Sequence, residues 1–133
     1  MTIEDSVSIA RPPEVVYAFL RDLERGPEWQ DSLESVDVEA GTEVRQIGGR
    51  RATAHFLVME DDPPRRLVIR SEGGPADARA AFELEPDGDG TRVLFTLDVD
   101  LRGAARLAAG VVKAAAQRET RGNLRRLKEV LEQ

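Results

Sequence analysis

The chain has no cysteine and a single histidine, His55, among its 133 residues. Without cysteine it can form no disulfide, no thiolate nucleophile and no thiolate metal site. One histidine cannot form a two-histidine metal cluster, and the carboxylates show no spacing of the kind found in calcium-binding loops. The glycine pairs lack the lysine and the strand-to-helix context of a phosphate-binding loop. We therefore expect neither a bound metal nor another cofactor.

Long apolar runs and an excess of basic residues are also missing. No stretch approaches the roughly 20 apolar residues that span a bilayer, and the first residues lack the basic start and apolar run of a signal peptide. The net charge is -6, which argues against a nucleic-acid partner because clustered Lys and Arg bind phosphate backbones. We expect a cytoplasmic protein with no nucleic-acid partner and no stable insertion into a membrane.

The residues that are present have the composition of an ordinary globular protein, with 41% hydrophobic and 33% charged side chains. A chain of this length suits one hydrophobic core rather than two. We therefore expect residues 1–133 to form one domain.

The beginning of the chain predicts a strand followed by a short helix. Apolar and polar residues alternate up to about Ala10, which is typical of a half-buried strand. Pro12 and Pro13 then suit the first turn of a helix, where a missing N–H costs nothing. The apolar residues after them recur at helical spacing until residues 25–27, Arg-Gly-Pro, end the segment.

Residues 33–101 predict a series of strands joined by short turns, which pair as an antiparallel meander. In the last two predicted strands apolar residues alternate with charged ones, so one face of the sheet is buried and the other meets water. Two small residues, Ala78 and Ala80, lie on the buried face. Either they leave room for a cavity or they allow a helix to approach closely.

The last part of the chain, residues 102–132, predicts one long helix whose two halves disagree in phase. Leu124, Leu127 and Leu131 define a buried face, but seven-residue steps back along that face lead to Gln117 and Lys113.

Two explanations stay open. Either the helix bends near Gly110 or Gly122, or it is straight and directs Lys113 and Gln117 towards a hydrated cavity. A straight helix would also leave an apolar edge at Leu107 and Val111, which is a candidate for homodimer or membrane contact.

Five segments, taken in order, carry a resemblance to a known family. They are residues 10–20 (ARPPEVVYAFL), 27–29 (PEW), 62–67 (DPPRRL), 88–93 (GDGTRV) and 123–128 (NLRRLK). The chain resembles the bacterial polyketide cyclase/dehydrase and lipid-transport family of the SRPBCC (START/Bet v 1-like) superfamily. The resemblance implies an α+β helix-grip fold, in which a curved antiparallel sheet of about seven strands surrounds a long C-terminal helix.

The resemblance also implies a hydrophobic or aromatic ligand, such as a lipid, a polyketide or a quinone-like molecule, between the sheet and the helix. We expect Lys113 and Gln117 to be polar anchors for it. Trp29 either contacts the ligand or packs the helical connection onto the sheet. The expected pocket wall consists of Trp29, Phe56, Ile69, Ala80, Phe82 and Phe95.

An aromatase/cyclase would need acid/base groups inside that pocket. His55 points outward if its neighbours Ala54 and Phe56 face inward, so the candidate catalytic residues are Ser71, Tyr17 and Lys113. Three functions stay open: a ligand-binding protein, a polyketide cyclase/dehydrase, and a non-catalytic protein-interaction module whose cavity is filled by side chains.

Overall fold

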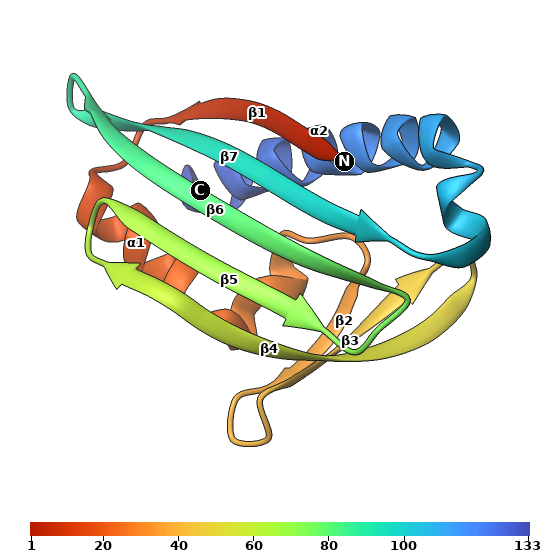
Figure 1. The fold of residues 1–133 in the computed structure, drawn as a ribbon. Coiled ribbons are helices and arrows are strands. Elements are labelled where there is room, and N and C mark those ends of the chain that lie inside the picture. Colours follow the sequence, from red (N-terminus) through yellow and green to blue (C-terminus); the bar gives the residue numbers. More distant parts are fainter.

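The computed structural model describes all residues from 1 to 133. Seven antiparallel strands form one curved sheet, which wraps around the long C-terminal helix (Figure 1). No helix is both long and apolar enough to cross a membrane. The elements are β1 (Thr2–Ile9), α1 (Pro13–Arg21), η1 (Leu23–Glu28), β2 (Leu33–Asp37), β3 (Thr42–Ile47), β4 (Arg50–Asp62), β5 (Arg66–Glu72), β6 (Ala76–Asp87), β7 (Gly90–Leu101), η2 (Gly103–Arg106) and α2 (Ala109–Leu131).

The order of strands in the sheet is β1-β7-β6-β5-β4-β3-β2, so the first strand pairs with the last and the others follow as a meander. The turns fall where the sequence predicts them. Gly73 and Gly88, in the β5–β6 and β6–β7 turns, have φ angles of 84° and 59°, in the left-handed region that glycine adopts at little cost. The predicted helix-grip fold is confirmed.

The predicted start of the long helix is wrong by seven residues. Gly103 has a φ angle of 56°, and the short 3-10 helix η2 and a turn precede α2, which begins only at Ala109. From there α2 runs unbroken past Gly110 and Gly122, so neither glycine interrupts it. Before the buried Thr120, the side chains of Ala116 and Val112 are half-buried, whereas Lys113 and Gln117 are exposed.

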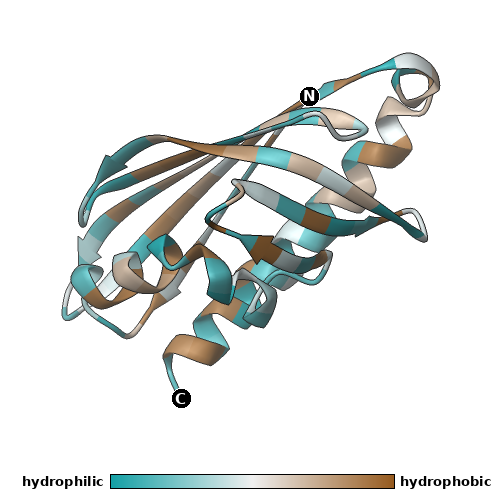
Figure 2. Ribbon diagram, turned by 90° about the horizontal axis from the view of Figure 1, so that it is seen from below, coloured by the Kyte–Doolittle hydropathy of each residue, from teal (hydrophilic) through white to brown (hydrophobic).

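The hydrophobic core lies at one end of the grip, between the sheet, α1 and the second half of α2. Val16 of α1, Leu67 of β5, Val93 of β7 and Leu127 of α2 are all fully buried there. Figure 2 shows how apolar segments alternate with polar ones along the strands and around α2. The core therefore fills only the part of the concave face that α1 also covers.

The end of α2 is fastened to the end of β1. Lys128 Nζ donates a hydrogen bond to the carbonyl oxygen of Ser8 at 2.7 Å, and the Ala10 N–H donates one to Glu132 Oε2 at 2.8 Å. Arg11 Nη1 adds a third to the carbonyl oxygen of Leu131 at 3.0 Å. These bonds join residues that are about 120 positions apart in the chain.

Candidate functional site

The concave face of the sheet is closed at one end and open at the other. Near α1, the inward side chains of Leu67, Leu84 and Val93 are buried. Further along the same strands, inward side chains are only partly covered, although side chains two positions apart share a face. This second group consists of Ile69, Ser71, Ala78, Ala80, Phe95, Leu97 and Val99. The helix therefore does not close on the sheet at this end.

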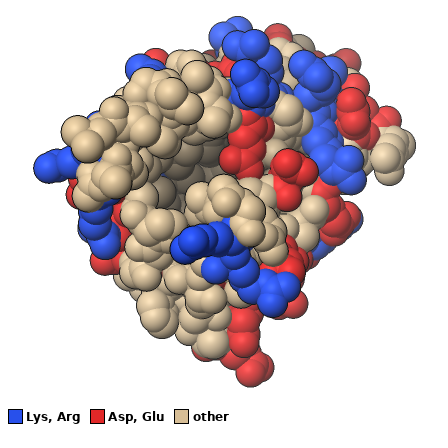
Figure 3. All heavy atoms as spheres, turned by 90° about the vertical axis from the view of Figure 1, so that its right-hand side faces the viewer, with Lys and Arg blue, Asp and Glu red and all other residues tan.

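A hollow is visible at the open end. Figure 3, which views the molecule from the right-hand side of Figure 1, shows a deep recess with mostly uncharged atoms on its walls and charged side chains around it. This end carries η2, the start of α2 and the β3–β4 turn (Figure 1). A pocket of about 380 Å³ lies here, between the last residues of β7 and Ala109. Ala78 and Ala80 do not line this pocket; they are half-buried on the inner face of β6.

Three aromatic rings connect the closed core to the hollow. The Trp29 ring meets Phe82 edge to face with centroids 6.0 Å apart, and Phe82 lies 5.0 Å from Phe95. Trp29 and Phe82 are buried, whereas Phe95 is only half-buried. Trp29 thus packs the connection after η1 onto the sheet, and only Phe95 of the three reaches the open region.

The other residues predicted from the sequence occupy two different places. Phe56, Ile69 and Ala80 are half-buried on the inner face, and His55 is exposed on the outer face of β4. Lys113 and Gln117 are exposed on the first half of α2. Because Lys113 precedes the buried Thr120 by seven residues, it lies on the same side of the helix, at the open end rather than inside the core.

A polar cluster on the inner face contains the predicted candidate Ser71 and two residues that were not predicted, Glu43 and Arg45. Glu43 of β3 is only 7% exposed and accepts a hydrogen bond from the Ser71 hydroxyl of β5. Its second oxygen forms an ion pair with Arg45 at 3.0 Å. Arg45 also donates to Gln30 Oε1 at 2.9 Å and to Ser32 Oγ at 3.2 Å. A carboxylate, a hydroxyl and a guanidinium therefore lie together on the inner face of the sheet.

Hydrophobic alternation could not reveal this cluster because in β3 it predicts the wrong face of the strand to be buried. The apolar residue Val44 predicts that its own face is buried, whereas the register pairs Glu43 and Arg45 with the inward Ala54 and Ala52. The available signal was opposite charges two residues apart, which share a face and can pair. The small Ala54 lies between Glu43 and β5, so the carboxylate can reach across β4 to Ser71.

Tyr17 lies outside the hollow. It is buried in α1 at the closed end, where its hydroxyl donates to Asp61 and lies 3.1 Å from the carbonyl oxygen of Arg66. Arg21 Nε holds the same Asp61 carboxylate at 2.9 Å. Burial, and then the hydrogen bond to Asp61, raise the pKa of the Tyr17 phenol above its ordinary value. These contacts fasten α1 to β4 and β5 rather than presenting the hydroxyl to a ligand.

We expect Tyr17→Phe to lower the free energy of unfolding by about 1–2 kcal/mol near pH 7, because the hydroxyl and its charged acceptor lose their hydrogen bond. A raised pKa in the folded state means that the contribution is complete below the ordinary tyrosine pKa of 10.0 and is lost as the pH rises above it. Urea unfolding at several pH values should therefore show the variant and the wild type converging in alkali. An equal difference at every pH would contradict this assignment.

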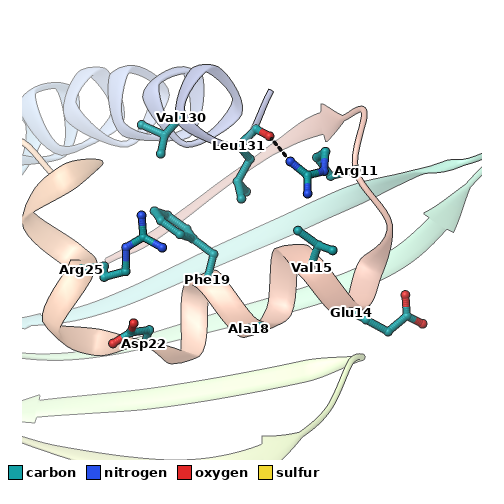
Figure 4. A pocket seen from close by; sticks show the side chains of 9 residues that line it. All are labelled: Arg11, Glu14, Val15, Ala18, Phe19, Asp22, Arg25, Val130 and Leu131. Carbon is teal, nitrogen blue, oxygen red and sulfur yellow. Dashed lines mark hydrogen bonds between the residues drawn. The ribbon is translucent and has the colours of Figure 1, made fainter. Parts of the chain in front are cut away.

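A second depression lies on the outside of the molecule, between α1 and the end of α2 (Figure 4). It has a volume of about 620 Å³, and two of the apolar side chains that line it, Phe19 and Leu131, are buried. The Arg25 guanidinium lies 4.6 Å from the centre of the Phe19 ring and is held by Glu28 at 2.7 Å. Phe19 and Leu131 therefore offer little surface to a ligand, although the half-buried Val15 and Val130 and the exposed Ala18 also line the groove.

Comparison with known proteins agrees with this geometry. The family model for polyketide cyclase/dehydrase and lipid transport matches residues 1–132. The chain belongs to this family. No curated protein matches it at a significant level. Members of the family are named for cyclisation or dehydration of polyketides and for lipid transport, and both imply a hydrophobic ligand in the grip.

Solved structures extend the family assignment to the fold. The protein TTHA0849 from Thermus thermophilus is 25% identical, with a TM-score of 0.81 over 97% of this chain and 95% of that one. The Zhui aromatase/cyclase from Streptomyces sp. R1128 is 19% identical, with a TM-score of 0.81 over 99% and 93%. A START superfamily protein from Mycobacterium smegmatis is 18% identical, with a TM-score of 0.66 over 91% and 96%. The last two likenesses concern the fold alone.

Proposed function

We propose that this family member binds a hydrophobic or aromatic small molecule in the hollow between the sheet and α2. The observation that carries the proposal is the set of half-buried, inward apolar side chains at the open end, next to a core that is otherwise closed. A hydrophobic ligand binds by covering apolar surface of this kind, which lies in a concave site and is otherwise in contact with water. Its burial contributes about 25 cal/mol per Å² to binding.

The buried polar cluster supplies an anchor for such a ligand. Glu43 already accepts from Ser71 and pairs with Arg45, and these partners offset the desolvation cost of covering its charge with an apolar ligand. The Ser71 hydroxyl and the half-buried Arg45 can exchange one of their present partners for a carbonyl or hydroxyl of the ligand. We propose that the ligand has one polar end near Ser71 and an apolar body against Ile69, Ala80 and Phe95.

The experiment that tests this function begins with the protein as purified. Native mass spectrometry, followed by organic extraction and identification of what is released, should reveal a co-purifying hydrophobic compound. Stripped protein should then take up the apolar dye anilinonaphthalene sulfonate, and the fluorescence of Trp29, the one tryptophan, reports whether the fold persists. Protein that carries nothing and takes up no dye would contradict the proposal.

Cyclisation or dehydration of a polyketide is the second candidate function, and the presence of Glu43 and Ser71 on the inner face favours it. The two functions differ in what Ser71→Ala does. In a binding protein we expect an affinity loss of about tenfold, the value of about one hydrogen bond. In an enzyme the same change should lower kcat on a poly-ketone with little effect on KM, and steady-state kinetics would separate the two.

Cytoplasmic location, the absence of a nucleic-acid partner and a homodimer stay predictions. The net charge of -6 supports the absence of a nucleic-acid partner. Cell fractionation and sedimentation of the purified protein are the measurements that test location and oligomeric state.

A further inference from the structure

Charge is divided very unevenly along the chain. Residues 101–131, which contain η2 and α2, hold eight basic and two acidic side chains, although the whole chain is acidic with a net charge of -6. The basic residues are Arg102, Arg106, Lys113, Arg118, Arg121, Arg125, Arg126 and Lys128, and the acidic ones are Glu119 and Glu129. Such an asymmetry in a small acidic protein indicates a surface that meets an anionic partner.

Some of these basic groups serve the fold, and others are free. Lys128 bonds to Ser8, and Arg126 Nε donates to the carbonyl oxygen of Glu28 at 2.6 Å. Arg118, Arg121 and Arg125, in contrast, are exposed and make no hydrogen bond or ion pair with the protein. Three guanidinium groups on the outward side of α2 therefore contribute nothing visible to the stability of the grip.

Near the mouth of the hollow, the exposed side chains just before α2 and in its first turn are apolar. Leu107 is 93% exposed and Val111 is 74% exposed, and Lys113 is the only polar side chain in residues 107–116. Val111, Arg118 and Arg125 are spaced by seven residues, so they lie along one face of the helix. Leu107 lies in the turn just before α2. We call the exposed residues Leu107, Val111, Arg118, Arg121 and Arg125 the outer α2 stripe, which is apolar at the mouth and cationic beyond it.

We propose that the outer α2 stripe docks this protein on the surface of an anionic lipid bilayer. An apolar tip enters the boundary between headgroups and acyl chains, and the adjoining arginines meet the phosphates. Binding of this kind accounts for both the exposed apolar side chains and the exposed arginines. The proposal is independent of the ligand-binding function, because Arg118, Arg121, Leu107 and Val111 do not line the hollow.

Two other partners fit the stripe less well. A nucleic acid would use the arginines but would leave Leu107 and Val111 in water. A second copy of the chain, related by twofold symmetry, would present the same surface again. A contact over the arginines would bring those of the two copies together, and a contact confined to Leu107 and Val111 would leave the arginines without a partner. A lipid surface uses the apolar tip and the cationic part together.

Vesicle flotation tests the proposal. The wild type should float with vesicles of phosphatidylcholine and phosphatidylglycerol and stay below those of phosphatidylcholine alone. Arg118→Glu with Arg121→Glu should weaken partitioning about tenfold or more, because each cationic group near an anionic surface contributes. Leu107→Asp with Val111→Asp should weaken it comparably, and high salt should weaken the wild type.

Matched variants elsewhere serve as controls. Leu57→Asp with Met59→Asp changes two apolar side chains, each 56% exposed on β4, and Arg50→Glu with Arg79→Glu reverses two exposed arginines without partners in the protein. Both should float like the wild type. Three results would overturn the proposal: equal binding to neutral vesicles, loss of binding in the controls, or a dimer in sedimentation that Leu107→Asp dissociates while no vesicle binding occurs. Dye uptake in the hollow should persist in every stripe variant that folds.

Discussion

Replacing Ala80 by tryptophan is expected to abolish uptake of the apolar dye while the protein stays folded. Ala80 lies on the inner face of β6 between Ile69 and Leu97, and all three are half-buried at the open end. An indole at this position would occupy the space that a ligand needs. We expect the affinity for the dye to fall about a hundredfold, the equivalent of about 2.8 kcal/mol.

The control for this change is Arg79→Trp, which places the same ring on the outer face of the same strand because side chains alternate. It should leave dye binding unchanged. The stability of Ala80→Trp shows whether the position is open or already packed. A ring that enters empty space changes the free energy of unfolding little, whereas a ring forced into a packed region lowers it by about 1–3 kcal/mol. Undiminished dye binding by folded Ala80→Trp would show that the hollow is not the ligand site.

The largest expected loss of stability belongs to Leu127→Ala. Leu127 has no exposed surface and lies in the cluster that joins α2 to α1 and the sheet. Removing its side-chain atoms leaves a cavity that neighbouring residues cannot fully close, and such changes cost about 2–5 kcal/mol. Urea unfolding followed through Trp29, which lies in the same cluster, would measure the loss.

Leu107→Ala is the matched control, since it removes the same atoms from a side chain that is 93% exposed. It should change the free energy of unfolding by less than about 0.5 kcal/mol. If both variants lost the same amount, or if Leu127→Ala lost less than about 1 kcal/mol, the second half of α2 would not be the part that closes the core.

The sheet could be predicted from the sequence because its signals are local. Glycine turns at Gly73 and Gly88 and the alternation in β6 and β7 need no knowledge of tertiary contacts, and the structure follows them. The start of α2 could not, because alanine-rich sequence after Gly103 suits a helix as well as it suits the turn that is observed. Sequence periodicity fixes elements well and their ends poorly.

The candidate site was harder to predict for a different reason. Periodicity identifies inward apolar residues such as Ile69 and Ala80, but it cannot tell which of them are covered, and that depends on where α1 ends and how far α2 stands from the sheet. Glu43 and Arg45 were missed because charged residues are expected to face water. Their burial depends on mutual pairing and on Ser71, which comes from a strand two places away.

The pairing of β1 with β7 sets the order in which this molecule can assemble during synthesis. The first strand leaves the ribosome early but has no partner until about ninety residues have followed, and the bonds that join Lys128 to Ser8 and Glu132 to Ala10 form later still. In the meantime Ile3 and Ile9, which are buried in the finished protein, stay in contact with water. Long-range closure of this kind slows folding and lengthens the time for which nascent chains are exposed to aggregation.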